Sequence, residues 1–409
     1  MANLVLKPST GAGNSVIIKD QGGGSVLTTA DSGAEINNVT SITASGNLTI
    51  AGDLVPATPL SHRNMIINGD MQISQRGTTF TGLGDGSVFT LDRWKYVDEG
   101  TTDSRITISQ NSTTPTGQGF GKALYVDVTT ADTSLDSGHI HYLRYAFEGQ
   151  DLQQLAYGSS SAKSMTLSFW VKSPKTGIHV VSLKGDYSSN NRMVSGTYTI
   201  ATADTWEKHT ITFPGDTSGT IANDNSAELD IHFYLSAGSS KSSGTLSTTW
   251  IASVEANRAV GQVNLMDNTS NNFYITGVQL ELGSSATPFE HRSYGDELAR
   301  CHRYYWRWSA GTYPYTAFAP GQGYSGSQAN GVRSFPTTMR TAPSFSVSSD
   351  SHFWWSSGAG NTVPSDIEQW GANEDTSLLI VNCSATAGYG GYIRAGNSTA
   401  AYAEYNAEL

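Results

Sequence analysis

The stretch NFYITGVQLELGSSATPFEHRSYGDELARCHRYYW, residues 272–306, contains a strand pattern, a polar turn with a proline, and a helix pattern in direct succession. Apolar residues alternate with polar ones in GVQLELG, which is typical of a strand with one buried face. Further along, Ser293 stands three residues before Asp296, the spacing of a capping box at a helix N-terminus. The stretch therefore predicts the last strand of one domain, a boundary near Pro288, and a linking helix over residues 291–308.

The expected helix carries one apolar stripe. Its members recur at spacings of three and four residues and are Tyr294, Leu298, Cys301, Tyr305 and Trp308. A helix of this length is only marginally stable in isolation. We therefore expect the stripe to pack near a three-fold axis or against the base of the domain that follows.

Upstream, residues 63–290 read as a succession of strands. Runs such as KALYVDV, HIHYLRYAF, MTLSFWVKS and LDIHFYLS alternate apolar and polar residues, and turns rich in Gly, Asn, Asp and Ser separate them. Helical patterns are nearly absent from this region, so the strands should be antiparallel. The sequence predicts an all-β fold whose central part, 63–290, is a two-sheet sandwich.

The two flanking regions differ from the centre. Residues 309–409 are again β-like and rich in Gly and Ser, and they predict a small C-terminal β domain, the tip. Residues 1–60 contain no aromatic residue, although SITASGNLTIAGDLV alternates regularly. Such a segment is a flexible tether, or its thin apolar face meets copies of itself in an oligomer. The regular alternation favours the second interpretation, a β-structured shaft.

Composition excludes several function classes. The formal net charge is −11, which disfavours sequence-independent binding to nucleic acid. No apolar run approaches the roughly 20 residues needed to cross a bilayer, so no membrane insertion is expected. The opening MANLVLKPSTGAGNS has too short an apolar core for a secretory signal. Cys301 and Cys383 lack any metal-binding spacing and are expected to be unpaired thiols of a protein made in a reducing cytoplasm.

Two sets of short sequence segments resemble those of known protein families. NMIINGDMQ (64–72), LSFWVKSP (167–174), TWEKHTITFPGD (205–216) and GVQLELG (277–283) resemble the carbohydrate-binding-module type of β-jelly roll. NMIINGDMQISQRGT (64–78), LDRWKY (91–96), the stretch 277–307, FPTTMRTAP (335–343) and the terminal AEL (407–409) resemble bacteriophage tail-fibre and related virion structural proteins.

The second resemblance implies a role. It implies a homotrimeric fibre of the virion, made in the host cytoplasm, in which residues 1–60 attach to tail or capsid proteins. The C-terminal part would be exposed for attachment to a host-surface glycan or another receptor. A capsid-surface fibre or decoration protein is the alternative placement, and the N-terminal residues do not separate the two.

A glycan-degrading tail spike is the enzymatic alternative. Glycoside hydrolysis needs two carboxylates about 5–10 Å apart in a cleft. Pairs such as Asp127 with Asp132, or Glu228 with Asp230, sit in no informative motif. Nucleophile-elbow, zinc-protease and phosphate-loop motifs are absent from the sequence. The sequence therefore favours a protein that is not an enzyme.

No cofactor is expected. His139 and His141 share one face of a strand, as two metal ligands would, but the same face continues with apolar residues, so packed or surface histidines are favoured over a metal site. The carbohydrate-binding jelly rolls that the centre resembles often hold a structural calcium near their first and last strands. That resemblance makes Asn68, Asp70 and Glu281 the candidate oxygen ligands.

Aromatic residues are the candidates for glycan contact. Trp94, Trp170, Trp206 and Trp250 lie in strand-like runs, where a core role is favoured. In SDSHFWWSSGAGN, however, Trp354 and Trp355 are neighbours on an extended backbone and must point in opposite directions, so at least one is exposed. Tyr313, Tyr315 and Tyr324 occupy similar Gly- and Pro-rich surroundings. For these five residues, receptor contact and packing at a trimer interface both remain open.

Overall fold

The computed structural model describes residues 17–19, 25–30, 33–36, 62–100, 104–185 and 191–409. The chain forms two compact units, residues 1–57 and 58–409. In the first unit three strands pair antiparallel in chain order, β1 (Ile17–Lys19), β2 (Ser25–Ala30) and β3 (Gly33–Ile36). Strands are thus present within GNSVIIKD and GGSVLTTAD, whereas the longer run SITASGNLTIAGDLV lies outside the described residues.

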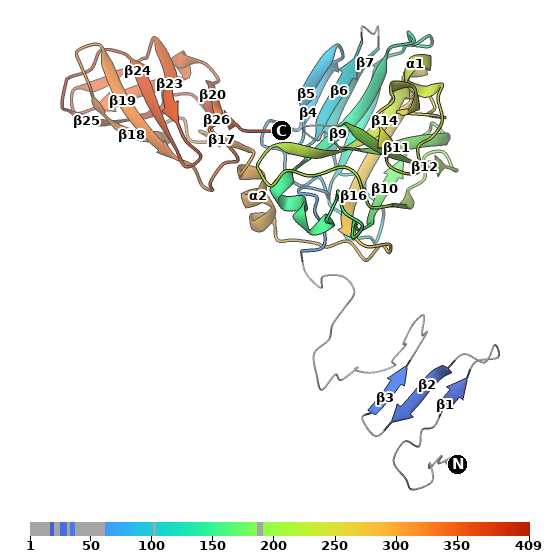
Figure 1. The fold of residues 1–409 in the computed structure, drawn as a ribbon. Coiled ribbons are helices and arrows are strands. Elements are labelled where there is room, and N and C mark those ends of the chain that lie inside the picture. The colour runs from blue at the N-terminus through green and yellow to red at the C-terminus, as the bar shows by residue number, and fades with distance from the viewer. Residues whose placement is uncertain (1–16, 20–24, 31–32, 37–61, 101–103, 186–190) are drawn as a thin grey trace. The chain divides into compact units, whose positions relative to one another are not determined.

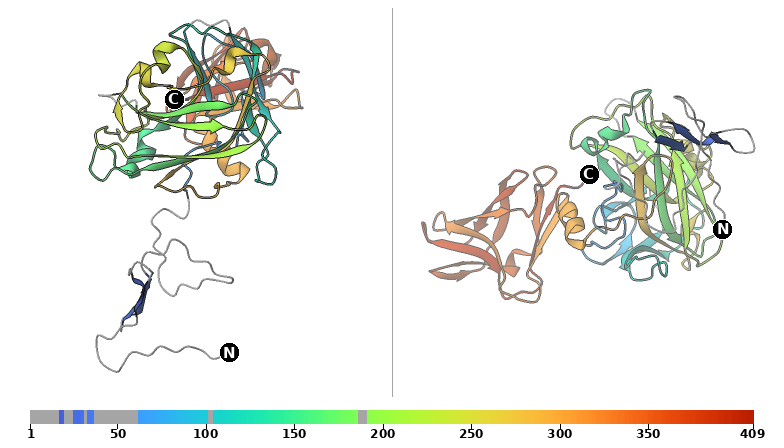
Figure 2. Two further views of the ribbon diagram at one scale, coloured as in Figure 1. Left: turned by 90° about the vertical axis from the view of Figure 1, so that its right-hand side faces the viewer. Right: turned by 90° about the horizontal axis from the view of Figure 1, so that it is seen from below.

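The second unit begins with two antiparallel sheets that face each other as a sandwich (Figures 1 and 2). The six-stranded sheet has the order β13-β10-β16-β8-β7-β4 and consists of β4 (Thr79–Leu83), β7 (Arg105–Asn111), β8 (Ala123–Thr130), β10 (Met165–Lys172), β13 (Glu207–Phe213) and β16 (Asn272–Leu282). The seven-stranded sheet has the order β15-β12-β11-β14-β9-β6-β5 and consists of β5 (Gly86–Phe89), β6 (Lys95–Glu99), β9 (Ile140–Glu148), β11 (Gly177–Gly185), β12 (Arg192–Ile200), β14 (Ala227–Ala237) and β15 (Ile251–Ala252).

The main hydrophobic core lies between these two sheets. Trp94, Phe169 and Phe233 are fully buried there, and the apolar positions of the alternating strands supply most of the other core residues. Short helical segments occupy the connections and are η1 (Gly149–Leu155), α1 (Ser239–Ser242), η2 (Glu255–Asn257) and η3 (Leu265–Asp267). The burial of one face of each sheet is the physical reason that the alternating sequence forms a sandwich.

The C-terminal part has two further antiparallel sheets around a second core. A three-stranded sheet of order β17-β26-β20 consists of β17 (Tyr305–Ser309), β20 (Ser344–Val347) and β26 (Tyr402–Asn406). A seven-stranded sheet of order β22-β21-β25-β18-β19-β24-β23 consists of β18 (Ala317–Gly323), β19 (Gln328–Ser334), β21 (Phe353–Ser357), β22 (Gly360–Thr362), β23 (Asp366–Ala372), β24 (Thr376–Asn382) and β25 (Gly390–Ala395), with η4 (Asp350–His352) before β21. The fold is all-β, as the sequence predicts.

The linking helix is shorter than the sequence predicts. Helix α2 runs only from Tyr294 to His302, and Ser293 caps it by accepting a hydrogen bond from the Asp296 backbone N–H. The chain then forms β17, because the aromatic run YYWRW favours an extended strand and pairs along its length with β26. The prediction of one apolar stripe along a single helix is therefore wrong.

Its five members are distributed over two elements. Cys301 is fully buried at the end of α2 and Leu298 is half-buried, but the ring of Tyr294 is 62% exposed. Tyr305 and Trp308 are buried on β17, and Trp308 packs in the second core beside Phe318 and Phe353. The part of the prediction that concerns a three-fold axis stays a prediction.

Residues near the C-terminus return to the first sandwich. The Glu408 carboxylate forms an ion pair with Arg93, and both side chains are at most 2% exposed. Arg76 approaches the same carboxylate at 3.3 Å. Arg303, just after α2, makes a bidentate ion pair with the buried carboxylate of Glu148 at 2.7 and 2.6 Å. These charge pairs join the tip to the jelly roll.

No helix in the described ranges is long and apolar enough to cross a membrane. Cys301 and Cys383 are both buried and free, and burial raises the pKa of each thiol.

Candidate functional site

The outer face of the six-stranded sheet carries several aromatic side chains among its polar ones. Along β10, Phe169 points into the main core, whereas Trp170 and Lys172 point outward and are half-exposed. This follows from the two-residue repeat of a strand, which sends successive side chains to opposite faces of the sheet. Trp170 and Lys172 are therefore available to a ligand, whereas Thr166 and Ser168 on the same face are buried.

The strand register gathers further aromatic residues around Trp170. Lys172 of β10 lies opposite Tyr274 of β16, and Tyr274 lies opposite Tyr125 of β8. The ring centroids of Tyr125 and Tyr274 are 4.4 Å apart, and that of Trp206 lies 5.9 Å from Tyr274. We call these four residues, Tyr125, Trp170, Trp206 and Tyr274, the aromatic face.

A groove of about 490 Å³ lies at one end of the aromatic face. It is lined by Gln118, Phe120, Ser168, Trp170, Lys208, Gly277, Ala286, Thr287, Pro288, Phe289 and His291. Phe120 and Phe289 meet edge to face with ring centroids 5.1 Å apart. Gly277 has a left-handed backbone, and a Cβ there would come within 2.5 Å of the Phe120 ring. A glycine at this position is therefore what allows Phe120 to form one wall of the groove.

Hydroxyl groups and a lysine ammonium accompany the rings of this surface. The Nζ of Lys172 lies 4.4 Å from the centroid of the Tyr274 ring, a cation–π contact. Tyr125 donates a hydrogen bond from its hydroxyl to Asp127 at 3.0 Å. Burial, helped by Asp127, raises the pKa of the Tyr125 hydroxyl, and burial also raises that of Tyr274, so both remain neutral donors near pH 7.

No Asp or Glu occurs among the described residues that line the groove. An apolar ring wall, a few hydroxyl and amide groups and a lysine can hold a neutral, hydroxyl-rich molecule. They do not supply the pair of carboxylates that glycoside hydrolysis requires.

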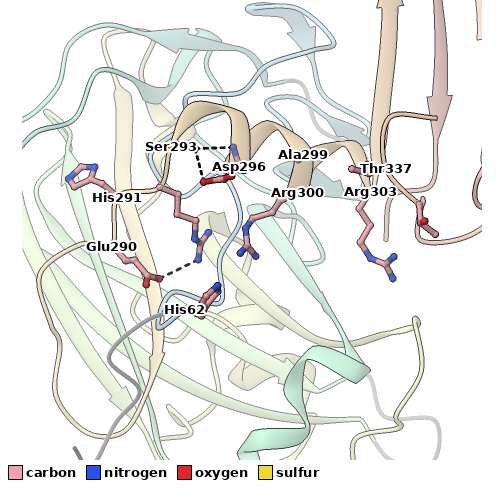
Figure 3. Close-up of a pocket in the computed structure, with 11 residues that line it drawn as sticks. His62, Glu290, His291, Ser293, Asp296, Ala299, Arg300, Arg303 and Thr337 are labelled. Atoms are coloured by element: carbon pink, nitrogen blue, oxygen red, sulfur yellow. Dashed lines mark hydrogen bonds and ion pairs between the residues drawn. The ribbon is translucent and has the colours of Figure 1, made fainter. Parts of the chain in front are cut away.

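A second cavity, of about 710 Å³, lies beside α2 and is lined mainly by charged residues (Figure 3). Arg292 donates hydrogen bonds to the backbone carbonyls of Ile66 and Asn64 and also contacts Glu290 and Glu297. In Figure 3 the side chains of Arg300 and His62 point into the same space from opposite sides. Because most of these charges already serve to anchor the start of the jelly roll to α2, this cavity is better explained as part of the joint than as a binding site.

The tip brings three of the five predicted glycan-contact residues together. Tyr313 and Tyr315 meet at 5.9 Å between ring centroids, and Tyr315 lies 5.9 Å from Trp354. Trp354 faces outward from β21 and is half-exposed. Arg394 of β25 lies directly opposite Trp354 in the sheet, a partner that sequence reasoning missed.

The other two predicted tip residues lie elsewhere. Trp355 is only 1% exposed and belongs to the second core, so its assignment as a glycan-contact residue is wrong. The reason is the same strand alternation that turns Trp354 outward. Tyr324 is exposed, but it lies at the end of β18, where its backbone N–H donates to the carbonyl of Gln328. Trp370, on the edge strand β23, is 71% exposed and was not singled out from the sequence.

The four tryptophans assigned to the core divide equally. Trp94 is fully buried, and Trp250 packs against the main core, as expected. Trp170 and Trp206 belong to the aromatic face, so a core role is wrong for them. The sequence did carry a signal for Trp170, because it alternates with Phe169 and Val171 in MTLSFWVKS. Tyr274 carried the same signal, because it alternates with Phe273 and Ile275 in NFYITG, whereas Phe120 and Phe289 had no comparable local signal.

The calcium candidates are not placed as one set of ligands. The Asn68 amide is buried and bonds to the backbone of Ile73 and Asp92. Glu281 accepts hydrogen bonds from the N–H and hydroxyl of Thr287. Asp70 is half-buried, and burial together with Glu297 raises the pKa of its carboxyl group. Within the described parts of the chain, no group of three or more His, Cys, Asp or Glu could hold a metal ion.

The histidine pair also serves packing. Nδ1 of His141 lies 2.8 Å from the hydroxyl of Tyr96, and His141 is fully buried. His139 is buried beside Asp136 at 3.8 Å. Burial lowers the pKa of His141 to about 4, so its ring is neutral at pH 7.

Comparisons with known proteins place the chain near carbohydrate-binding modules and a phage tailspike domain in structure only. No family model and no curated protein matches the sequence. The enzymatically active domain of tailspike protein 4 of bacteriophage CBA120 matches with a TM-score of 0.29 and 13% identity. The match covers 54% of this chain and 21% of the tailspike chain.

Two carbohydrate-binding modules match at similar levels. A module of family 4 has a TM-score of 0.27 and 14% identity over 53% of this chain and 97% of its own. The family 11 module of a cellulosomal cellulase of Clostridium thermocellum has a TM-score of 0.25 and 16% identity. The match covers 49% of this chain and 91% of the module. At these levels the likeness carries no argument about function, which must come from the residues themselves.

Proposed function

We propose that the jelly roll binds a glycan across the aromatic face and does not cleave it. The observation that carries this proposal is the outward placement of Trp170 beside the groove, with Tyr274 and Trp206 on the same face. Flat rings with apolar faces pack against the C–H faces of sugar rings, while the neighbouring amide, hydroxyl and ammonium groups bond to sugar hydroxyls. A cluster of half-exposed rings on the outside of a sheet is typical of a surface that meets a ligand.

The role of this binding is attachment of a phage to its host. In this proposal the protein is a homotrimeric tail fibre of a bacteriophage virion, joined to the particle through residues 1–60. The sequence segments that resemble those of virion fibre proteins support this role. The net charge of −11 also supports it, because it disfavours nucleic acid as the partner. Mass measurement in solution tests the trimer, and a well-folded monomer at micromolar concentration would contradict it.

Glycan binding is tested with an array of neutral bacterial surface polysaccharides and the full chain. Trp170→Ala should lower the affinity for any bound neutral glycan by about tenfold or more, because a ring at the centre of a binding surface carries much of the binding energy. Trp370→Ala is the matched control, since it removes an equally large exposed ring from a different sheet. Equal binding by wild type and Trp170→Ala would overturn the assignment of the site.

Cleavage is tested separately on any polysaccharide that binds. The absence of carboxylates from the described groove lining supports binding without hydrolysis. Incubation with the full chain should release no new reducing ends. A steady release of oligosaccharides would instead make the protein a glycan-degrading spike.

A further inference from the structure

The outward face of the tip sheet has an arginine at its centre with aromatic rings on several sides. The guanidinium carbon of Arg394 lies 5.2 Å from the ring centroids of both Tyr315 and Trp354, and 5.9 Å from that of Tyr392. Tyr313 extends the cluster through its contact with Tyr315. We call Tyr313, Tyr315, Trp354, Tyr392 and Arg394 the arginine patch.

The arginine is held in place by neutral groups. Its Nε donates to the Ser356 hydroxyl at 2.6 Å, and its Nη2 donates to the Asn361 side-chain oxygen at 3.1 Å. Among the described residues, no carboxylate lies within 4.0 Å of this guanidinium. No side chain or backbone group in these parts of the chain accepts a hydrogen bond from its Nη1. The guanidinium is therefore fixed and half-exposed, and some of its five N–H donors, those of Nη1 among them, can bond to a ligand.

The rings around the arginine are fixed as well. The Tyr315 hydroxyl donates to the side-chain oxygen of Asn397 at 2.9 Å. Gly396 lies so close to Trp354 that a Cβ there would come within 2.6 Å of the indole ring. Because these rings are already ordered, a ligand that stacks on them loses little additional side-chain freedom on binding.

We propose that the arginine patch is a second saccharide site and that it selects sugars bearing a carboxylate, such as uronic or sialic acid residues. A guanidinium edge matches the two oxygens of a carboxylate, and the flanking rings of Trp354 and Tyr313 offer faces for the sugar ring. The protein as a whole is acidic and repels anions at long range, so the attraction must come from a cation at the contact itself. The described lining of the groove on the jelly roll carries a lysine, Lys208, and no arginine fixed between aromatic rings, and the proposal goes beyond the function assigned to that groove.

Paired probes test the proposal on the full chain. Oligogalacturonate, oligoguluronate and sialyllactose are each compared by titration calorimetry with their methyl esters, which keep the sugar and remove the charge. We expect at least one acid to bind, with about tenfold loss on esterification. Arg394→Gln should cause a similar loss and abolish the difference between acid and ester, and Arg394→Lys should recover part of it. Trp354→Ala should weaken both forms, and Trp370→Ala should change neither.

Several results would overturn the proposal. These are a lack of binding by all three acids at millimolar concentration, unchanged binding by Arg394→Gln, or an equal effect of Trp370→Ala. Binding of polyglutamate without binding of any acidic sugar would assign the patch to an acidic protein partner and would also overturn it. Thermal unfolding of each variant checks that it folds. In a Trp170→Ala background acidic-sugar binding should persist, so failure at one surface is distinguishable from failure at the other.

Discussion

The jelly roll and the tip each place two aromatic neighbours on one strand, one ring inside and one outside. In β10, Phe169 is fully buried and Trp170 faces outward, whereas in β21 Trp355 is buried and Trp354 faces outward. The two outward rings differ in the cation beside them. Trp170 has Lys208 as its cross-strand partner, and Trp354 has Arg394.

This difference shows where the chemistry of each surface originates. The same two-residue repeat creates a core and a binding face in both regions, so the outward tryptophan alone does not select a ligand. The residue across the sheet adds the selection, because cross-strand neighbours on one face are in direct contact. A mobile ammonium at the edge of a groove suits hydroxyl groups, and a fixed guanidinium between rings suits a carboxylate.

The inward rings should matter most for stability. Phe169→Ala and Trp355→Ala should each lower the free energy of unfolding by about 3–5 kcal/mol, because each removes a large ring from a packed core and leaves a cavity. Urea unfolding followed by circular dichroism measures this loss. A loss below about 1 kcal/mol in either variant would show that the paired in-and-out arrangement is wrong for that strand.

Loss of the Arg93–Glu408 ion pair between the jelly roll and the tip should have the second-largest effect on stability. Glu408→Ala should lower the free energy of unfolding by about 3 kcal/mol, since it leaves Arg93 buried without its carboxylate. The loss should lie at the low end of the range because Arg93 still bonds to the Ala146 carbonyl and stacks on Tyr304.

The same variant tests whether jelly roll and tip behave as one body. Two unfolding transitions should appear in place of one, visible by calorimetry. Glu368→Ala, an exposed carboxylate on the tip, is the control and should change little. A single unshifted transition in Glu408→Ala would mean that other contacts suffice to join the regions.

Acid should weaken the jelly roll more than the tip. Burial lowers the pKa of His141, His179 and His232 to about 4. A lowered pKa in the folded state means that the unfolded chain binds the proton first, so stability is present above pH 6.5 and is lost as pH falls toward 4. Each histidine should cost about 2 kcal/mol at pH 5.

Buried carboxyl groups of the jelly roll oppose this loss, and the tip supplies the comparison. Burial raises the pKa of Asp70, Asp98 and Asp151 as well as that of Asp92. Burial raises the pKa of Asp92 to about 6, so its contribution increases as pH falls through 6. The net effect should still be a loss, because three histidines at about 2 kcal/mol each outweigh the return from these carboxyl groups. Hydrogen exchange of peptides from each region at pH 7 and 5, corrected for intrinsic rates, measures it. Equal protection changes in jelly roll and tip, whose sequence has only His352 beyond residue 309, would contradict the prediction.

The outward rings should matter least for stability. Trp170→Ala and Trp354→Ala should change the free energy of unfolding by about 1 kcal/mol or less, because both rings are half-exposed. The same urea experiment measures this. A larger loss would indicate that the ring is part of the packing, and its effect on binding would then have no simple interpretation.

Local sequence patterns predicted much of the fold. The alternation in runs such as MTLSFWVKS and LDIHFYLS was sufficient to place strands and to predict a two-sheet sandwich. The spacing of Ser293 and Asp296 predicted the start of α2, where the cap is present. These features depend on residues a few positions apart, which a sequence displays directly.

Features that depend on distant strand pairing could not be predicted. The end of α2 was missed because the partner of β17 is β26, about a hundred residues later in the chain. The aromatic face requires the register of β10 with β16 and of β16 with β8, and the arginine patch requires that of β21 with β25. No local pattern states which residue will stand opposite Trp170 or Trp354.

The pairing of β17 with β26 has a mechanical consequence. Tyr305 at the start of β17 lies opposite Asn406 at the end of β26, so the chain enters and leaves the tip through two adjacent strands. A domain on a single linker swivels about it, whereas one held by two neighbouring strands resists rotation and shares any pulling force between them. A pulling force on the tip would pass through this strand pair and through the Arg93–Glu408 contact behind it.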